Sequence, residues 1–95
     1  MRRVASEVNI PISMDWSKDE VVYAVNFYEA IDQAYGKGIK RERLLSLYNQ
    51  FKQIVPSKSE EKQHFKNYEK QTGQSAYHVV KKAKDYESGD MIVMK

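Results

Sequence analysis

The sequence predicts an all-α fold, a single small domain in which about four helices form an irregular array or bundle. Apolar residues recur at spacings of three and four over several stretches, which is the period of a helix with one buried face. Serine followed three residues later by glutamate stands where two of these stretches begin, and glycine or proline stands where they end. At 95 residues, the chain is long enough for one core and too short for two.

The first helix is expected to begin after Ser17. Ser17 is the expected N-cap, Glu20 completes a capping box, and Trp16 and Val21 occupy the positions of a hydrophobic staple. Gly36 is expected to end the helix in the left-handed conformation. The apolar face between these ends is wide and implies a central helix. It consists of Val21, Ala24, Val25, Tyr28, Ile31 and Tyr35, widened by Val22, Phe27, Ala30 and Ala34.

The second helix is expected from about residue 40 to residue 54, where Pro56 prevents it from continuing. Its apolar face consists of Leu44, Leu47, Tyr48, Phe51 and Val55. The turn at Pro56 leads to a third helix, for which Ser57 is the expected N-cap and Glu60 closes a second capping box. This helix is expected to be peripheral and half exposed, because its large apolar residues before the glycine at position 73 are Phe65 and Tyr68.

A fourth helix is expected after Ser75, which serves as its N-cap. Its apolar stripe consists of Ala76, Val79, Val80 and Ala83. We therefore divide the chain into an extended lead-in over residues 1–14, a four-helix domain over residues 15–89 and a C-terminal tail over residues 90–95. The tail is apolar enough to dock on the domain, although chain ends more often fray.

Several of these stretches resemble a known family, the uncharacterised protein family numbered 0223, whose members are small proteins of low-GC Gram-positive bacteria. The resemblance lies in Asp15-Trp16-Ser17 with Glu20, in Phe27 to Tyr35 followed by Gly38, in the run from Phe51 to Lys62, and more weakly in Gly73, Ser75, Tyr77 and Lys82-Ala83-Lys84. It implies four helices in an irregular array. It implies no activity, cofactor or substrate, so no catalytic residue is carried over.

The residues themselves contain no catalytic constellation, and we expect no catalytic residue, no cofactor and no metal site. Glu61 and His64 have the Glu-x-x-His spacing of di-iron helices, but no second motif of this kind follows. The serines at positions 17, 57 and 75 are explained as N-caps. An enzyme or a metal protein is therefore the second alternative, after the two binding functions described next.

The charge of the chain is uneven. Residues 1–35 hold three Lys/Arg and six Asp/Glu, a balance of −3, whereas residues 36–95 hold thirteen and seven, a balance of +6; together they give the net charge of +3. Basic residues gather near the start of the second helix and on the fourth helix. They are Lys37, Lys40, Arg41 and Arg43, and Lys81, Lys82 and Lys84. Nucleic-acid binding through these two helices is the first alternative function.

We prefer a non-enzymatic function, a small cytoplasmic adaptor or regulatory protein that acts on an unknown protein partner. Tyr23, Tyr77 and Tyr86 lie off the apolar stripes, and exposed tyrosines favour interfaces. The candidate interaction surface joins the start of the first helix to that of the third. It consists of Asp15, Trp16, Pro56, Ser57, Lys58, Glu61 and Lys62, of which Lys58, Glu61 and Lys62 are expected to be exposed.

The expected location is the cytoplasm. The chain has no cysteine, which agrees with a reducing compartment. No apolar run of signal-peptide length follows the basic start, and the apolar run at residues 91–94 is far too short to span a bilayer. We therefore expect no membrane contact. The oligomeric state stays open.

Overall fold

The computed structural model describes residues 16–87 and 89–94. Within them it contains four helices and two short strands. These are α2 (Lys18–Tyr35), β1 (Ile39–Lys40), α3 (Arg41–Ile54), α4 (Lys58–Thr72), α5 (Ala76–Asp85) and β2 (Met91–Ile92). The predicted all-α fold with four helices is confirmed. The lead-in over residues 1–14, and Asp15 of the predicted surface, lie outside the described residues.

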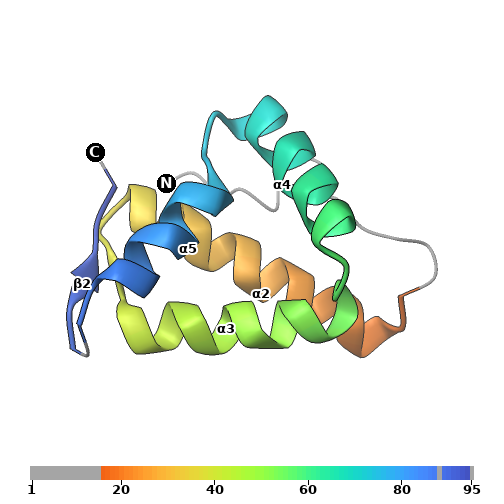
Figure 1. Cartoon of the computed structure of the whole chain (residues 1–95), viewed down its shortest axis with the longest axis horizontal. Helices are drawn as coiled ribbons and strands as arrows, with labels where there is room; N and C mark the ends of the chain where they lie inside the picture. The colour runs from red at the N-terminus through yellow and green to blue at the C-terminus, as the bar shows by residue number, and fades with distance from the viewer. Residues whose placement is uncertain (1–15, 88, 95) are drawn as a thin grey trace.

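The helices form an irregular array around an antiparallel pair (Figure 1). α2 and α3 run side by side in opposite directions, and α5 crosses them near the end that carries the two strands. α4 leads away from the other end of α3, so it borders the array rather than its centre. This agrees with its sparse apolar face, because within α4 the buried residues are Phe65 and Tyr68.

An aromatic cluster joins α2, α3 and α4 in the core. The Phe27 ring stacks on Phe51 with centroids 4.8 Å apart and on Phe65 at 5.7 Å. The Tyr28 ring stacks on Tyr68 at 4.4 Å. Offset ring pairs of this kind add stabilisation to the burial of their apolar area. The predicted stripe of the first helix thus lies in the core, and Phe27 is part of it.

The prediction that Val22 widens the apolar face of this helix was wrong, because Val22 is 48% exposed. Val22 is followed at spacings of four and seven by Asn26 and Glu29, both exposed. These positions share one side of a helix, so Val22 lies on the polar face of α2 rather than at the edge of its apolar face.

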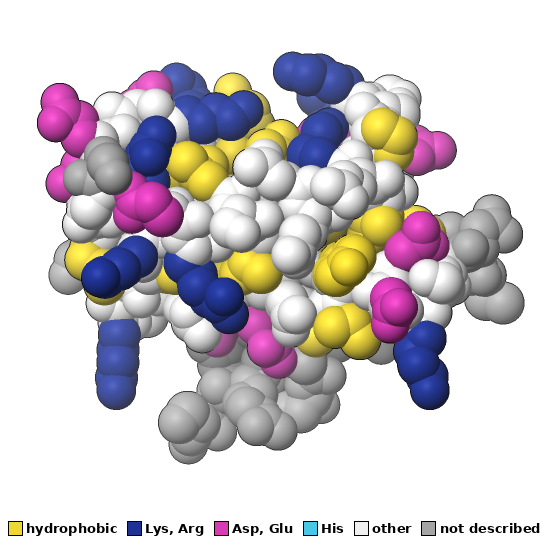
Figure 2. Space-filling view, turned by 90° about the horizontal axis from the view of Figure 1, so that it is seen from below, with side chains coloured by type: hydrophobic (Ala, Val, Ile, Leu, Met, Phe, Trp, Pro, Cys, Tyr) yellow, Lys and Arg dark blue, Asp and Glu magenta, His cyan; other side chains and the backbone are white. Residues whose placement is uncertain are grey.

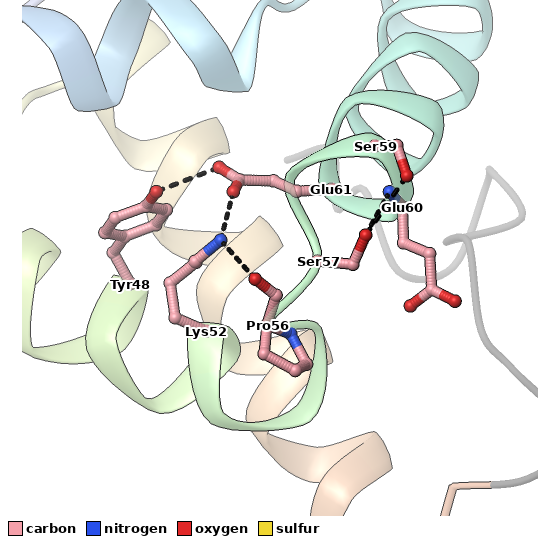
Figure 3. A network of polar contacts seen from close by, with 7 residues as sticks. All are labelled: Tyr48, Lys52, Pro56, Ser57, Ser59, Glu60 and Glu61. Carbon is pink, nitrogen blue, oxygen red and sulfur yellow. Dashed lines mark hydrogen bonds and ion pairs between the residues drawn. The ribbon is translucent and has the colours of Figure 1, made fainter.

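Serine side chains cap the N-termini of three of the helices, as expected. At α2 the capping box is complete, because the Glu20 N–H donates to Ser17 Oγ at 3.2 Å and the Ser17 N–H donates to Glu20 Oε1 at 2.8 Å. At α4 only half of the predicted box forms. The Glu60 N–H donates to Ser57 Oγ at 3.4 Å, but the Glu60 carboxylate points away from the turn (Figure 3). Ser57 Oγ lies 3.1 Å from Ser59 Oγ instead.

The end of α2 differs from the prediction. Gly36 has a φ of −106°, outside the left-handed region, and the residue with positive φ is Gly38, at +107°. The N–H groups of both glycines donate to the Gln33 carbonyl. The turn therefore ends α2 at Gly36 and uses Gly38 to direct the chain into β1.

The two strands are the elements that the sequence analysis missed. β1 and β2 are antiparallel, with Ile39 opposite Ile92 and Lys40 opposite Met91. Ile92 is fully buried, and the Met94 N–H donates to the Ala34 carbonyl at 2.7 Å. The apolar end of the chain is thus docked against the ends of α2 and α3. Strands of two residues carry no alternating pattern, which is why the sequence offers no signal for them.

Candidate functional site

A polar network fixes α4 to the end of α3 (Figure 3). Tyr48 donates its hydroxyl to Glu61 Oε2 at 2.9 Å, and Lys52 Nζ donates to Glu61 Oε1 at 2.5 Å. Lys52 Nζ also lies 3.5 Å from the Pro56 carbonyl. The Glu61 side chain is only 13% exposed. The expectation of an exposed Glu61 was therefore wrong, because this carboxylate is enclosed between two donors from α3.

The same network holds Tyr48 in its neutral form. Burial raises the pKa of the Tyr48 hydroxyl above its usual value, and so does the Glu61 carboxylate that accepts its hydrogen bond. A carboxylate that receives both a neutral hydroxyl and an ammonium group is satisfied on both oxygens. Glu61 therefore acts as a structural anchor at the base of the site.

An open groove lies beside this anchor, between α4 and α5. Two adjoining hollows of about 1180 and 270 Å³ form it, and both are lined by Lys58, Glu61, Phe65 and Tyr77. We call it the lysine groove. Its rim consists of Lys58, Lys62 and Lys66 from α4 and Lys81 and Lys84 from α5, and its apolar lining includes Phe65, Tyr77 and Val80.

Exposure differs sharply among the apolar residues of the lysine groove. Phe65 and Val80 are 7% and 5% exposed and belong to the core, whereas Tyr77 is 57% exposed. The Tyr48 ring, which also lines the groove, is covered by Lys84, whose Nζ lies 5.3 Å from the ring centroid. Tyr77 is therefore the large ring that the groove presents to solvent within the described residues.

The fold divides the two basic clusters expected from the sequence, because some of their cations bond to backbone carbonyls and others line the groove. Arg41 Nε donates to the Ala83 carbonyl, and Lys82 Nζ donates to the Val93 carbonyl, each at 2.7 Å. These two cations therefore join α5 to α3 and to the chain end. Lys81 and Lys84 instead line the groove. On the face shown in Figure 2, basic side chains lie at separate places with acidic ones among them.

The other part of the predicted surface lies on a different side of α4. Trp16 stacks on His64 with centroids 5.4 Å apart. Trp16, Pro56 and Ser57 are not among the residues that line the lysine groove, whereas Lys58, Glu61 and Lys62 are. The structure therefore brings three of the predicted residues to one site and places the other described ones elsewhere.

His64 is held as a neutral ring. Burial lowers the pKa of its imidazole below the usual value of 6.5, and the neighbouring Glu60 carboxylate opposes that shift. Its Nδ1 atom is buried without a hydrogen-bond partner in the part of the chain that the structure describes. The Glu61 and His64 side chains thus have separate structural surroundings.

Among the described residues, no group of three or more His, Asp and Glu side chains lies close enough together to hold a metal ion. The serines at positions 17, 57 and 75 accept hydrogen bonds from the first turns of α2, α4 and α5, as N-caps do. No helix in the described ranges combines the length and apolar character needed to cross a membrane.

Comparison with known proteins places the chain in a family. Residues 7–92 match the uncharacterised protein family UPF0223. The chain belongs to UPF0223. It is 51% identical to the UPF0223 protein of Oceanobacillus iheyensis over 75 residues, which cover 79% of this chain and 85% of that one. It is 46% identical to the UPF0223 protein of Lysinibacillus sphaericus over 86 residues, or 90% of each chain.

A third relative, the UPF0223 protein of Staphylococcus saprophyticus, is 48% identical over 75 residues, covering 79% of this chain and 82% of that one. UPF0223 is an uncharacterised family, so membership confirms the resemblance seen in the sequence and assigns no activity.

The interaction surface predicted from the sequence did not include Lys66 or Tyr77, which line the lysine groove. A signal was present, because Lys58, Lys62 and Lys66 follow one another at spacings of four and therefore share one side of α4. No such signal joins them to Tyr77 on α5, since only the packing of the two helices brings these residues to one groove.

Proposed function

We propose that this protein is a non-enzymatic cytoplasmic adaptor or regulatory protein that acts through protein–protein contacts made at the lysine groove. The observation that carries the proposal is Tyr77, a large ring that is 57% exposed among apolar neighbours and lysines. Aromatic residues with an apolar body and a polar tip are enriched at protein interfaces and often supply much of the binding energy.

The shape of the groove supports a macromolecular partner. Its larger hollow, about 1180 Å³, is open and exceeds the roughly 300 to 1000 Å³ of most small-molecule sites. The Tyr48–Glu61–Lys52 network holds α4 against α3 next to the groove. A partner would therefore meet a largely preformed surface, and less free energy would be lost to ordering it on binding.

Affinity capture from lysate of the source cells, run with and without nuclease and with bound proteins identified by mass spectrometry, tests the proposal. The variant Lys58→Glu/Lys62→Glu reverses two charges at the rim, and Lys18→Glu/Lys37→Glu reverses two exposed charges outside the groove. Glu61 is left unchanged because its loss would leave Lys52 without its carboxylate partner. We expect a protein that the unchanged chain and the control capture in equal amounts and the groove variant does not.

Retention of the same proteins by the groove variant would place the binding surface elsewhere. Nucleic-acid binding is the second candidate, favoured by the five lysines at the groove rim. In that case the captured material would disappear on nuclease treatment. Its affinity would also fall steeply with salt, because lysine–phosphate contacts release counterions.

A further inference from the structure

The lysines of the groove lie in two rows, one on each of the two helices that border it. Lys58, Lys62 and Lys66 are spaced four residues apart on α4, so successive side chains start about 6 Å apart along the helix. Lys81 and Lys84 are spaced three apart on α5. Both spacings place the side chains of each helix on one side of it. Positive charge from α4 thus lines the larger hollow, and positive charge from α5, together with Lys58, lines the smaller one.

Little negative charge within the groove offsets these rows. The carboxylates that line it are Glu61 and Glu69. Glu61 is already paired with Lys52, which lies outside the groove lining. Lys81 forms an ion pair with Asp85 at 3.7 Å, but the two side chains are 57% and 67% exposed, so water screens the pair. The groove therefore favours an occupant that carries several negative charges.

The apolar lining argues for a peptide rather than a nucleic acid. Single-stranded nucleic acids bind by stacking successive bases on exposed rings. Of the rings in the groove lining, Phe65 is 7% exposed, the Tyr48 ring is covered by Lys84, and only Tyr77 is well exposed. One exposed ring on the same side of α5 as Lys81 and Lys84 suits a segment that presents apolar side chains on one face and acidic ones on its flanks.

We infer that the lysine groove binds an acidic amphipathic helix of another protein, with apolar residues against Tyr77 and carboxylates paired to the lysine rows. Helices that dock in grooves present apolar anchors at spacings of three, four and seven, which leaves their flanks for charged side chains. This inference rests on the proposed function and adds the chemistry of the partner.

Selection from a library of random 16-residue peptides displayed on phage, with the full chain as target, tests the inference. We expect the enriched peptides to be rich in Asp and Glu, with apolar residues three and four apart. The synthetic form of the most enriched peptide should bind Lys62→Glu/Lys66→Glu about tenfold or more weakly by fluorescence anisotropy. It should bind the charge-matched control Lys18→Glu/Lys37→Glu as it binds the unchanged chain.

A second pair of variants tests the apolar contact. Tyr77→Ala should weaken the binding of the same peptide about tenfold, because the substitution removes the exposed ring of the groove. Tyr86→Ala, which removes an exposed ring outside the groove lining, should leave the affinity unchanged. Thermal melting of each variant shows whether a loss of binding reflects a loss of folding.

The contrary outcomes are distinct. Enriched peptides that are neutral or basic, and that still need Tyr77 and the lysines, would overturn the acidic partner and leave the proposed function standing. A selection with no peptide that depends on the groove would overturn both. Groove-dependent binding of a 16-nucleotide single strand without peptide binding would replace the inference with the nucleic-acid function. Concentration-dependent self-association lost in Lys62→Glu/Lys66→Glu would make a second copy the occupant.

Discussion

At Gly38 a single added methyl group would meet the docked end of the chain. A Cβ atom there would lie 2.7 Å from Val93 Cγ2 and 3.3 Å from the Ile92 carbonyl oxygen. The residue also has a φ of +107°, which side chains disfavour. Gly73 has a φ of +76° with open space around its Cβ position. Substitutions at the two glycines therefore separate the cost of backbone strain from the cost of steric conflict.

We expect Gly38→Ala to lower the free energy of unfolding by roughly 2 to 4 kcal/mol, the sum of strain and overpacking. Gly73→Ala should lower it by about 1 kcal/mol, from strain alone. Urea denaturation followed by circular dichroism measures both. Equal losses of unfolding free energy in the two variants would mean that the end of the chain shifts to make room for the added methyl group, and so does not pack tightly on Gly38.

His64 makes stability depend on pH. Its pKa is lowered in the folded protein, so between that value and 6.5 the unfolded chain binds more protons than the folded one. The stabilisation is therefore complete above about pH 6.5 and is lost as the pH falls through the folded pKa. We expect the melting temperature to fall between pH 7.5 and pH 5.

Two substitutions assign that dependence to one histidine. His64→Gln should flatten the fall, because the group that gains a proton on unfolding is gone. His78→Gln, at an exposed histidine, should keep it. Melting curves of the three proteins in matched ionic strength decide the matter. An unchanged slope in His64→Gln would show that another group carries the pH dependence.

At the scale of the element, α2 and α4 begin with the same residue type but different caps. Both serines accept a hydrogen bond from the residue three positions on, at 3.2 Å for Ser17 and 3.4 Å for Ser57. The return bond from glutamate is present at α2. At α4 the Glu60 carboxylate points elsewhere (Figure 3). The local sequence pattern is shared, but the backbone of the two N-caps differs, with ψ at 170° for Ser17 and 130° for Ser57.

We expect Ser17→Ala to destabilise the protein by roughly 1 to 2 kcal/mol and Ser57→Ala by roughly 0.5 to 1 kcal/mol, within the range known for lost N-caps. Chemical denaturation of both variants provides the comparison. In binding assays Ser57→Ala should behave like the unchanged chain, because Ser57 does not line the lysine groove. A loss of binding without a loss of stability would make Ser57 part of the contact surface.

At the scale of the whole molecule, the C-terminal segment closes the array. It pairs with β1, and the Arg41 N–H at the start of α3 donates to the Asp90 carbonyl at 2.9 Å. Lys82 of α5 donates to the Val93 carbonyl, and Ile92 is fully buried. A few residues at the end of the chain thus hold α2, α3 and α5 together, although α2 and α3 are distant from them in the sequence.

We expect Ile92→Ala to lower the free energy of unfolding by roughly 2 to 4 kcal/mol, as the loss of a large buried aliphatic side chain does. Met91→Ala, at a neighbouring residue that is 48% exposed, should cost less than about 1 kcal/mol. Urea denaturation distinguishes them. Similar small effects in both variants would mean that the chain end contributes little to the stability of the array.

The helices could be predicted from sequence because their signals are local. A capping serine, a stripe with spacings of three and four, and a proline such as Pro56 all act within one or two turns. The same holds for the peripheral position of α4, which follows from its few apolar residues. The candidate site was predicted only in part, through Lys58, Glu61 and Lys62, because these lie on one helix.

Local spacings and capping residues thus predict the helical class, the starts of the helices and most of the faces that they bury. Only the packing of the helices shows that Glu61 is enclosed by Tyr48 and Lys52, that Ile92 is buried beside β1, and that lysines from α4 and α5 border one groove. These features depend on contacts between side chains far apart in the sequence, and no local spacing encodes which of them will meet.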